Sequence, residues 1–60
     1  MGNLNGTLEP GMLVRHADQP DWGTGQVQSR IGLRISVNFE HQGKVVIDGA
    51  HVVLLPVFEP

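Results

Sequence analysis

The sequence predicts an all-β fold: a small antiparallel barrel of five short strands that follows a flexible leader. The clearest indication is the segment 33–40, in which Leu, Ile, Val and Phe alternate with polar residues, as in a strand with one buried face. Turns that contain Gly or Pro separate the apolar segments, and no segment has helical periodicity. An open sheet of five strands in about 45 residues would leave exposed edges, so we expect the sheet to close.

The first part of the chain predicts a leader, a turn and one strand. Residues 1–9 contain two Asn and two Gly without periodicity, so we expect a flexible leader there and a domain over 10–60. Pro10 and Gly11 predict a turn, because Pro and Gly favour the backbone angles that turns require. Residues 12–16 alternate between two faces and predict the first strand.

The second strand is expected at residues 24–29, after a turn at residues 17–21 (ADQPD). Gly25 interrupts this strand. A glycine inside a strand marks a bulge, a kink or a close approach to the backbone, and the Trp22 ring is the neighbour we expect to approach. Ile31 and Gly32 predict a tight turn before the alternating segment.

The last third of the chain predicts two further strands. His41, Gln42 and Gly43 form the expected hairpin connection, with Gly where a positive φ is needed. Residues 44–48 (KVVID) predict the return strand. Residues 48–50 predict a turn, with one turn of 3₁₀ helix as an alternative. Residues 51–55 (HVVLL) predict the last strand. Pro56 should end it, because proline cannot donate to a ladder.

Composition excludes several classes of protein. The 60 residues allow one small domain, and the absence of cysteine excludes disulfides and thiolate ligands. No apolar segment approaches the ~18 residues of a membrane span, and the first residues lack the features of a secretory signal. We therefore expect a cytoplasmic protein. The net charge of −2 argues against a dedicated nucleic-acid binder.

Catalytic and metal-binding chemistry have little support in the sequence. His16, His41 and His51 form no spaced ligand motif, so we expect each to make an ordinary hydrogen bond at a strand end or turn. Asp18 and Asp21 lie in a turn segment, where aspartate more often caps its own backbone. A domain of this size should offer little concavity for the ~300 Å³ that a small-molecule site needs. We expect neither an enzyme nor a cofactor.

A binding surface is the remaining possibility, and five residues are its candidates. A tryptophan beside a turn often anchors a partner, although Trp22 could instead pack on the core. Arg34 and Lys44 could share an outer surface, and Arg15 and Arg30 follow the same outward alternation; as an alternative, four scattered cations form only a solvated face. The candidates are Trp22, Arg34, Lys44, Arg15 and Arg30.

The segment 52–58 (VVLLPVF) is more apolar than one strand face requires. Three explanations remain open. Both faces of the last strand could be covered, Val57 and Phe58 could fold back on the barrel, or an exposed patch could attract a partner or a second copy of the chain.

Three segments carry a resemblance to known proteins: VRHADQPDWGTGQV, VNFEHQGKVVI and VVLLPV. They resemble the Tudor-like, SH3-like barrel at the carboxyl terminus of UvrD/PcrA-type DNA-repair helicases. They are closer still to a family of short stand-alone bacterial proteins of unknown function. The similarity extends from Gly11 to Val57. The matching positions are Gly11, Val14, His16, Trp22, Gly23, Gly25, Val27, Val37, Phe39, Gly43 and Lys44.

The resemblance implies an SH3-like barrel that binds protein. In the helicases this module tethers the motor to RNA polymerase, and CarD-type transcription factors carry a similar barrel that contacts the same enzyme. The partner implied here is bacterial RNA polymerase or another transcription or DNA-repair protein. The basic contact position of the helicase hairpin falls on Lys44, and the aromatic-Gly turn falls on Trp22. The chain departs from the helicases in carrying no motor and in the acidic residues of segment 17–21.

Two alternatives to a protein-binding module stay open. A small β-barrel can present basic and aromatic residues to single-stranded nucleic acid. The apolar segment 52–58 could form a dimer seam, which would make the protein a self-associating structural domain. We accordingly expect a monomer or a weak homodimer.

Overall fold

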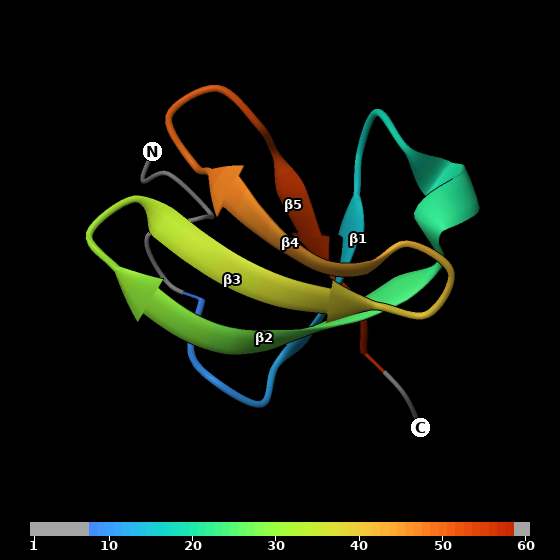
Figure 1. The fold of residues 1–60 in the computed structure, drawn as a ribbon, viewed down its shortest axis with the longest axis horizontal. Helices are drawn as coiled ribbons and strands as arrows, with labels where there is room; N and C mark the ends of the chain where they lie inside the picture. The colour runs from blue at the N-terminus through green and yellow to red at the C-terminus, as the bar shows by residue number, and fades with distance from the viewer. Residues whose placement is uncertain (1–7, 59–60) are drawn as a thin grey trace.

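The computed structural model describes residues 8–58, which form one antiparallel sheet of five strands (Figure 1). In sheet order the strands are β4, β3, β2, β1 and β5, and a short 3₁₀ helix lies between β1 and β2 in the chain. The expected all-β fold with five antiparallel strands is therefore confirmed. The elements are β1 (Leu13–His16), the 3₁₀ helix (Pro20–Trp22), β2 (Thr24–Ile31), β3 (Arg34–Phe39), β4 (Gly43–Asp48) and β5 (Leu54–Pro56).

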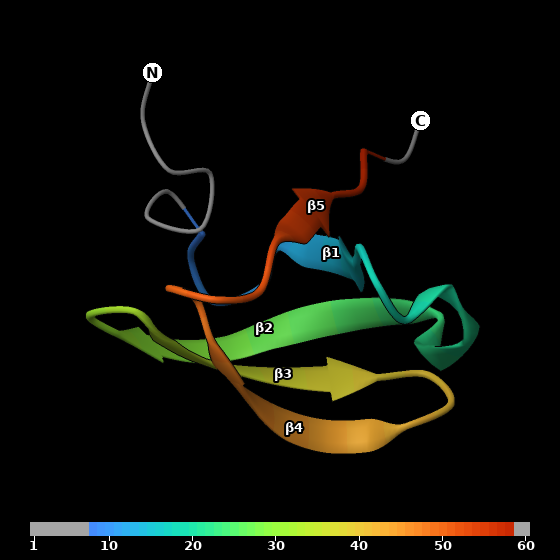
Figure 2. The same ribbon diagram turned by 90° about the horizontal axis from the view of Figure 1, so that it is seen from above.

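The sheet curls strongly but stays open between its two outer strands. Figure 2 shows β1 and β5 stacked over the layer that β2, β3 and β4 form. Within the described residues β4 pairs only with β3, and β5 pairs only with β1, so the expected closure into a barrel is not confirmed. β5 has three residues, and one of them is Pro56, which has no N–H to donate. So short a strand adds little to a closing ladder.

The strand ends differ from expectation mainly near the carboxyl terminus. β1 to β4 lie within two residues of their expected positions. The last strand was expected at 51–55 but occupies Leu54–Pro56, so its expected start was wrong, and Pro56 lies inside it. A proline fits there because β5 is an outer strand. The turn expected after β4 is present: the N–H groups of His51 and Val52 both donate to the carbonyl oxygen of Asp48.

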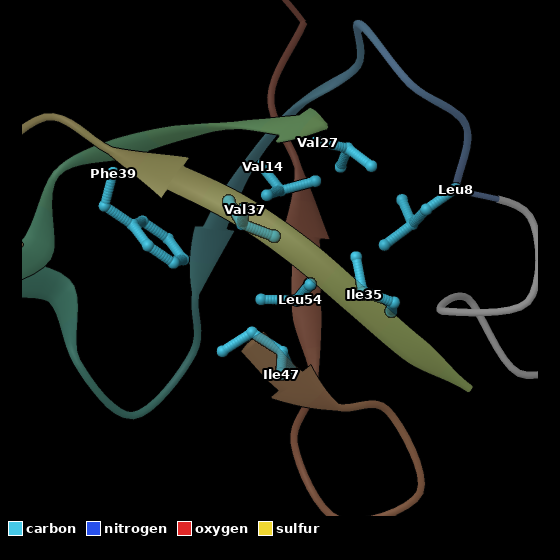
Figure 3. Packing of buried hydrophobic residues seen from close by; sticks show 8 residues of the cluster. All are labelled: Leu8, Val14, Val27, Ile35, Val37, Phe39, Ile47 and Leu54. Atoms are coloured by element: carbon cyan, nitrogen blue, oxygen red, sulfur yellow. The ribbon is translucent and has the colours of Figure 1, made fainter. Parts of the chain in front are cut away.

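One cluster of apolar side chains fills the interior of the curled sheet (Figure 3). Ile47 from β4 and Leu54 from β5 are both buried in it, so the two outer strands meet through side chains and not through a ladder. All five strands thus contribute to a single core. Its buried members are Leu8, Val14, Val27, Ile35, Val37, Phe39, Ile47 and Leu54.

Leu8 belongs to this core, although it was expected to lie in a flexible leader. Its side chain is 0% exposed, and its carbonyl oxygen accepts a hydrogen bond from Arg30 Nε at 2.8 Å. The turn at Pro10 and Gly11 carries the segment back along the sheet, where the Gly11 N–H donates to the Val27 carbonyl oxygen at 2.8 Å. The leader therefore does not extend to Leu8. The rest of it, apart from Glu9, lies outside the described residues.

Gly25 of β2 lies against two core side chains of the neighbouring strand β3. A Cβ atom at this position would lie 2.5 Å from Val37 Cγ1 and 2.7 Å from Phe39 Cδ1. Of the three alternatives for Gly25, the close approach is the one found. The approaching groups are Val37 and Phe39, however, so the expectation of the Trp22 ring was wrong. The irregularity in the register of β2 lies further along the strand, after Val27.

The apolar segment at the carboxyl end is only partly covered. Leu54 is buried and Val52 packs against the core, but Val53 and Leu55 are exposed and Phe58 is 86% exposed. Phe58 does not fold back on the core. Of the three explanations for this segment, the structure shows exposed apolar side chains beside β5.

The contact at Gly25 gives a first prediction. Replacing Gly25 with Ala should lower the free energy of unfolding by about 1–3 kcal/mol, because Val37 and Phe39 must move to admit the new methyl group. Urea unfolding followed by tryptophan fluorescence measures this change. Ser29→Ala, at an exposed position of the same strand, is the control and should change stability by less than about 0.5 kcal/mol. Equal effects of the two substitutions would contradict the steric argument.

Burial of Leu8 gives a second prediction. Leu8→Ala should destabilise the fold by about 2–4 kcal/mol, because it removes a fully buried side chain and leaves a cavity. Phe58→Ala is the matched control, since it removes a larger apolar side chain that is 86% exposed, and its effect should be small. Thermal unfolding by circular dichroism compares the two. An unchanged melting temperature for Leu8→Ala would place Leu8 outside the core.

Candidate functional site

The outer face of the sheet carries a row of side chains that crosses four strands. Cross-strand pairing places Leu13 of β1 beside Gln26 of β2, Gln26 beside Asn38 of β3, and Asn38 beside Lys44 of β4. These residues alternate with buried residues of the same strands, so their side chains lie on the solvent face. The β1–β2 pairing also places Arg15 next to Thr24, one row along.

An open hollow of about 620 Å³ lies on this face. We expected little concavity in so small a domain, and that expectation was wrong, because the hollow exceeds the ~300 Å³ typical of a small binding site. The hollow is a surface depression and not an enclosed cavity. Its lining residues are Leu13, Thr24, Gln26, Asn38, Phe39, Glu40 and Gly43.

The polar groups at the centre of the hollow are available to a partner. Among the described residues none forms a hydrogen bond with the side-chain amide of Gln26 or Asn38. Each amide has two N–H donors and one carbonyl acceptor. Two adjacent amides can therefore bind a group that both donates and accepts, such as the peptide unit of an extended chain.

Glu40 fixes one wall of the hollow. Its Oε1 atom accepts a hydrogen bond from the backbone N–H of Thr24 at 2.8 Å. This bond is the main reason why the pKa of Glu40 is lowered, and the Thr24 hydroxyl and the nearby His41 and Arg15 lower it further, against the opposing effect of desolvation. The hydrogen bonds and the nearby cations outweigh desolvation and favour the carboxylate form, so this wall is negatively charged near neutral pH.

Two of the candidate residues border the hollow. Lys44 lies at the end of the amide row beside Asn38 and is exposed. Arg15 is also exposed and lies beside Thr24 on the opposite side. The hollow therefore has a cation at each of two borders.

The other two cations lie elsewhere. Arg30 donates from Nε to the Leu8 carbonyl oxygen and from one terminal nitrogen to the Gly32 carbonyl oxygen at 3.2 Å, so it holds the chain in place. Arg34 is paired with Asp48 in the β3–β4 register. This pair lies four positions along the strand from the pair of Asn38 and Lys44, a distance of about 13 Å. The expected shared surface of Arg34 and Lys44 thus has its two members at opposite ends of one strand pair.

Trp22 packs against the core, which was the alternative to an exposed anchor. Its ring makes edge contacts with the rings of His16 and Phe39, at centroid distances of 4.8 and 5.2 Å. His16 is 8% exposed, and its Nδ1 atom accepts a hydrogen bond from the backbone N–H of Asp18 at 3.1 Å. This bond is of the kind that we expected for a histidine at a strand end.

The sequence did not single out Gln26, Asn38 and Glu40. Their outward positions follow from the alternation of residues in each strand. Their proximity depends on the register between β2 and β3, which contains an irregularity that the residue pattern does not reveal. Within the described part of the chain there is no group of three or more His, Asp or Glu that could hold a metal ion. Nor is any helix in the same residues long and apolar enough to cross a bilayer.

The hydrogen bond of Glu40 gives a third prediction, on the pH dependence of stability. Because the folded-state pKa of Glu40 is lowered, its contribution is present above the unfolded pKa of about 4.5 and is lost as the pH falls through the folded value. Glu40→Gln should therefore melt below the wild type at pH 7, and the difference should shrink as the pH falls below about 4.5. Thermal unfolding across this range measures it. Glu9→Gln, at an exposed position before β1, is the control; a pH-independent difference for Glu40→Gln would contradict the assignment.

Comparison with known proteins identifies a family of unestablished function. No curated protein and no solved structure matches the chain, so no relative confirms the resemblance to the helicase and transcription-factor barrels. One family model, described as a protein of unknown function (DUF3553), matches residues 8–57. The match begins at the buried Leu8 and continues past the end of β5, so it spans every strand of the fold. The chain therefore belongs to the DUF3553 family of proteins of unknown function.

Proposed function

We propose that this domain is a protein-interaction module and that the hollow on its outer face contacts the partner. The observation that carries the proposal is the pair of amides, Gln26 and Asn38, which lie in an open hollow between Arg15 and Lys44. Inward-facing side chains of the strands are used for the core, so the outer face is where a partner can be met.

The chemistry of the hollow suits an extended polypeptide. The amides can bind peptide groups, and Leu13 offers an apolar contact at one end of the row. Lys44 and Arg15 would attract acidic side chains of the partner, whereas Glu40 would attract a basic one. Since several charges are exposed at the border, they contribute more to specificity and to the association rate than to affinity.

Bacterial RNA polymerase is the partner that the resemblance supports. The helicase barrels bind that enzyme, and their basic hairpin contact falls on Lys44, which borders the hollow here. We also propose that the fold is an open member of the SH3-like class. The antiparallel order of its five strands and the curl that stacks β1 and β5 over the other three support this assignment.

Nucleic acid is a weaker alternative. The net charge is −2, Arg30 is engaged by backbone carbonyl groups, and Arg34 lies opposite Asp48. The cations left on the outer face are too few for the basic stripe that usually follows a phosphate backbone.

Reversing one border charge tests the proposal and gives a fourth prediction. Lys44→Glu should weaken binding to purified bacterial RNA polymerase roughly tenfold, because an attractive contact becomes repulsive. Biolayer interferometry with the immobilised domain measures the dissociation constant. Arg34→Glu is the matched control, since it makes the same charge change at the other end of the β3–β4 pair, and its affinity should stay within about twofold of the wild type.

Three results would count against the proposal. Equal loss in the two variants would indicate a general charge effect and not a contact at the hollow. Full binding by Lys44→Glu would remove the hollow border from the interface. If the wild type ignores RNA polymerase but binds labelled single-stranded DNA with a steep inverse dependence on salt, the nucleic-acid alternative replaces the proposal.

A further inference from the structure

β4 is an open sheet edge. It is the last strand in the sheet order, and Figure 2 shows it at the lower margin of the sheet with β3 on its inner side. Its six residues, Gly43–Asp48, make it twice as long as β5 at the opposite edge. An uncovered edge of this length presents backbone groups that can pair with another strand. Its side chains decide which strand is accepted.

The sequence of β4 is complementary to itself when it is reversed. It reads Lys, Val, Val, Ile, Asp from residue 44 to residue 48, with a cation at one end and an anion at the other. In an antiparallel pair centred on Val46, Lys44 of one copy faces Asp48 of the other, and the reverse contact follows by symmetry. Val45 faces Ile47 on the inner side of the same pair.

We infer that β4 pairs with β4 of a second copy of this chain, in this register, and that the two sheets form one continuous sheet in a symmetric dimer. Both charges lie on the outer face and are exposed, as is Val46 at 61%, so all three side chains are accessible to the second copy. Within its own chain Asp48 accepts a hydrogen bond from the Ala50 N–H at 3.0 Å and lies 3.7 Å from His51 Nε2, so a lysine of the second copy would add to these contacts. This interface uses the sheet edge, whereas the proposed partner uses the hollow; Lys44 lies where the two surfaces meet and takes part in both. The inference therefore goes beyond the proposed function.

A second hollow supports this register. It measures about 360 Å³, and its lining residues are Ile31, Leu33, Arg34, Val46, Ile47 and Asp48. Ile31 is 79% exposed, so the walls are not covered by the fold itself. The apolar part of this lining suits the methylene chain of a lysine whose ammonium group reaches Asp48, which that lysine would share with Arg34 on the neighbouring strand. In the proposed register that lysine is Lys44 of the second copy.

Other registers lose these contacts. A shift by two residues that places Lys44 opposite Val46 of the second copy keeps the same faces together but removes the contact between Lys44 of one copy and Asp48 of the other. Symmetric pairing of the two β4 edges also ends assembly at a dimer, because each copy uses its one long edge. Lys44 and Asp48 disfavour the pairing of β4 with other strands, but they permit its pairing with β4 of a second copy.

Complementary charge changes test the inference and give a fifth prediction. Lys44→Asp places two anions opposite each other in a homodimer, and Asp48→Lys places two cations there, so each variant should dimerise about tenfold or more weakly than the wild type. Mixed in equal amounts, the two variants should form a heterodimer, because both contacts then join opposite charges. The double variant, Lys44→Asp with Asp48→Lys, should dimerise as the wild type does.

Sedimentation equilibrium from ~10 µM to ~1 mM measures these constants, a range chosen because a six-residue edge is a small interface. Circular dichroism shows whether each variant is folded, and formation of the heterodimer shows it independently. A wild type that stays monomeric up to ~1 mM overturns the inference, as does a mixture that forms no heterodimer. The double variant should regain the dimer while its affinity for RNA polymerase stays reduced, which separates this outcome from that of the proposed function.

Discussion

The contact between the Gly25 backbone and the side chains of Val37 and Phe39 is the constraint on which the rest of the structure depends. The absence of a side chain at Gly25 leaves room for the Phe39 ring, which lies near the rings of His16 and Trp22 with centroid distances of 6.5 and 5.2 Å. These rings come from β1, the 3₁₀ helix and β3, so the contact joins the two layers of the curled sheet. Glu40 follows Phe39 directly, and its Oε1 atom accepts the hydrogen bond from the Thr24 N–H.

The cations of the chain differ in what they do in the folded domain. Arg30 is engaged with the carbonyl groups of Leu8 and Gly32, and so stabilises the fold. Arg15 and Lys44 remain at the borders of the outer hollow, and neither forms an ion pair or a side-chain hydrogen bond with another described residue. Arg15 lies close enough to Glu40 to contribute to the lowering of its pKa. A count of cations in the sequence does not separate these groups. The hydrogen bonds of Arg30 to the carbonyl groups of Leu8 and Gly32 show that one of the four cations is used within the domain.

Local features of the fold could be predicted from the sequence, and long-range ones could not. Alternation located β3, and the positive φ expected at Gly43 is present at 83°. Leu8 is buried among residues far along the chain, and its carbonyl oxygen accepts a hydrogen bond from Arg30, 22 residues away, which no local pattern encodes. The hollow was missed for the same reason, since Gln26 and Asn38 are adjacent only through the register of β2 and β3. The expected closure into a barrel was not confirmed, because the number of strands does not determine whether the last strand is long enough to pair with both β1 and β4.

The pairing of β1 with β5 has a consequence for how the chain folds. β2, β3 and β4 are joined by short connections and pair in sequence order, so these pairings need only small loops to close. Val14 and Pro56, by contrast, pair across about 40 residues, and three residues of β5 must compensate for the entropy of closing that loop. Docking of β5 should therefore follow formation of the three-stranded meander, and slow-exchanging amides should be concentrated in β2 and β3. β5 is then the last strand to pair when the domain folds and the first to separate when it unfolds.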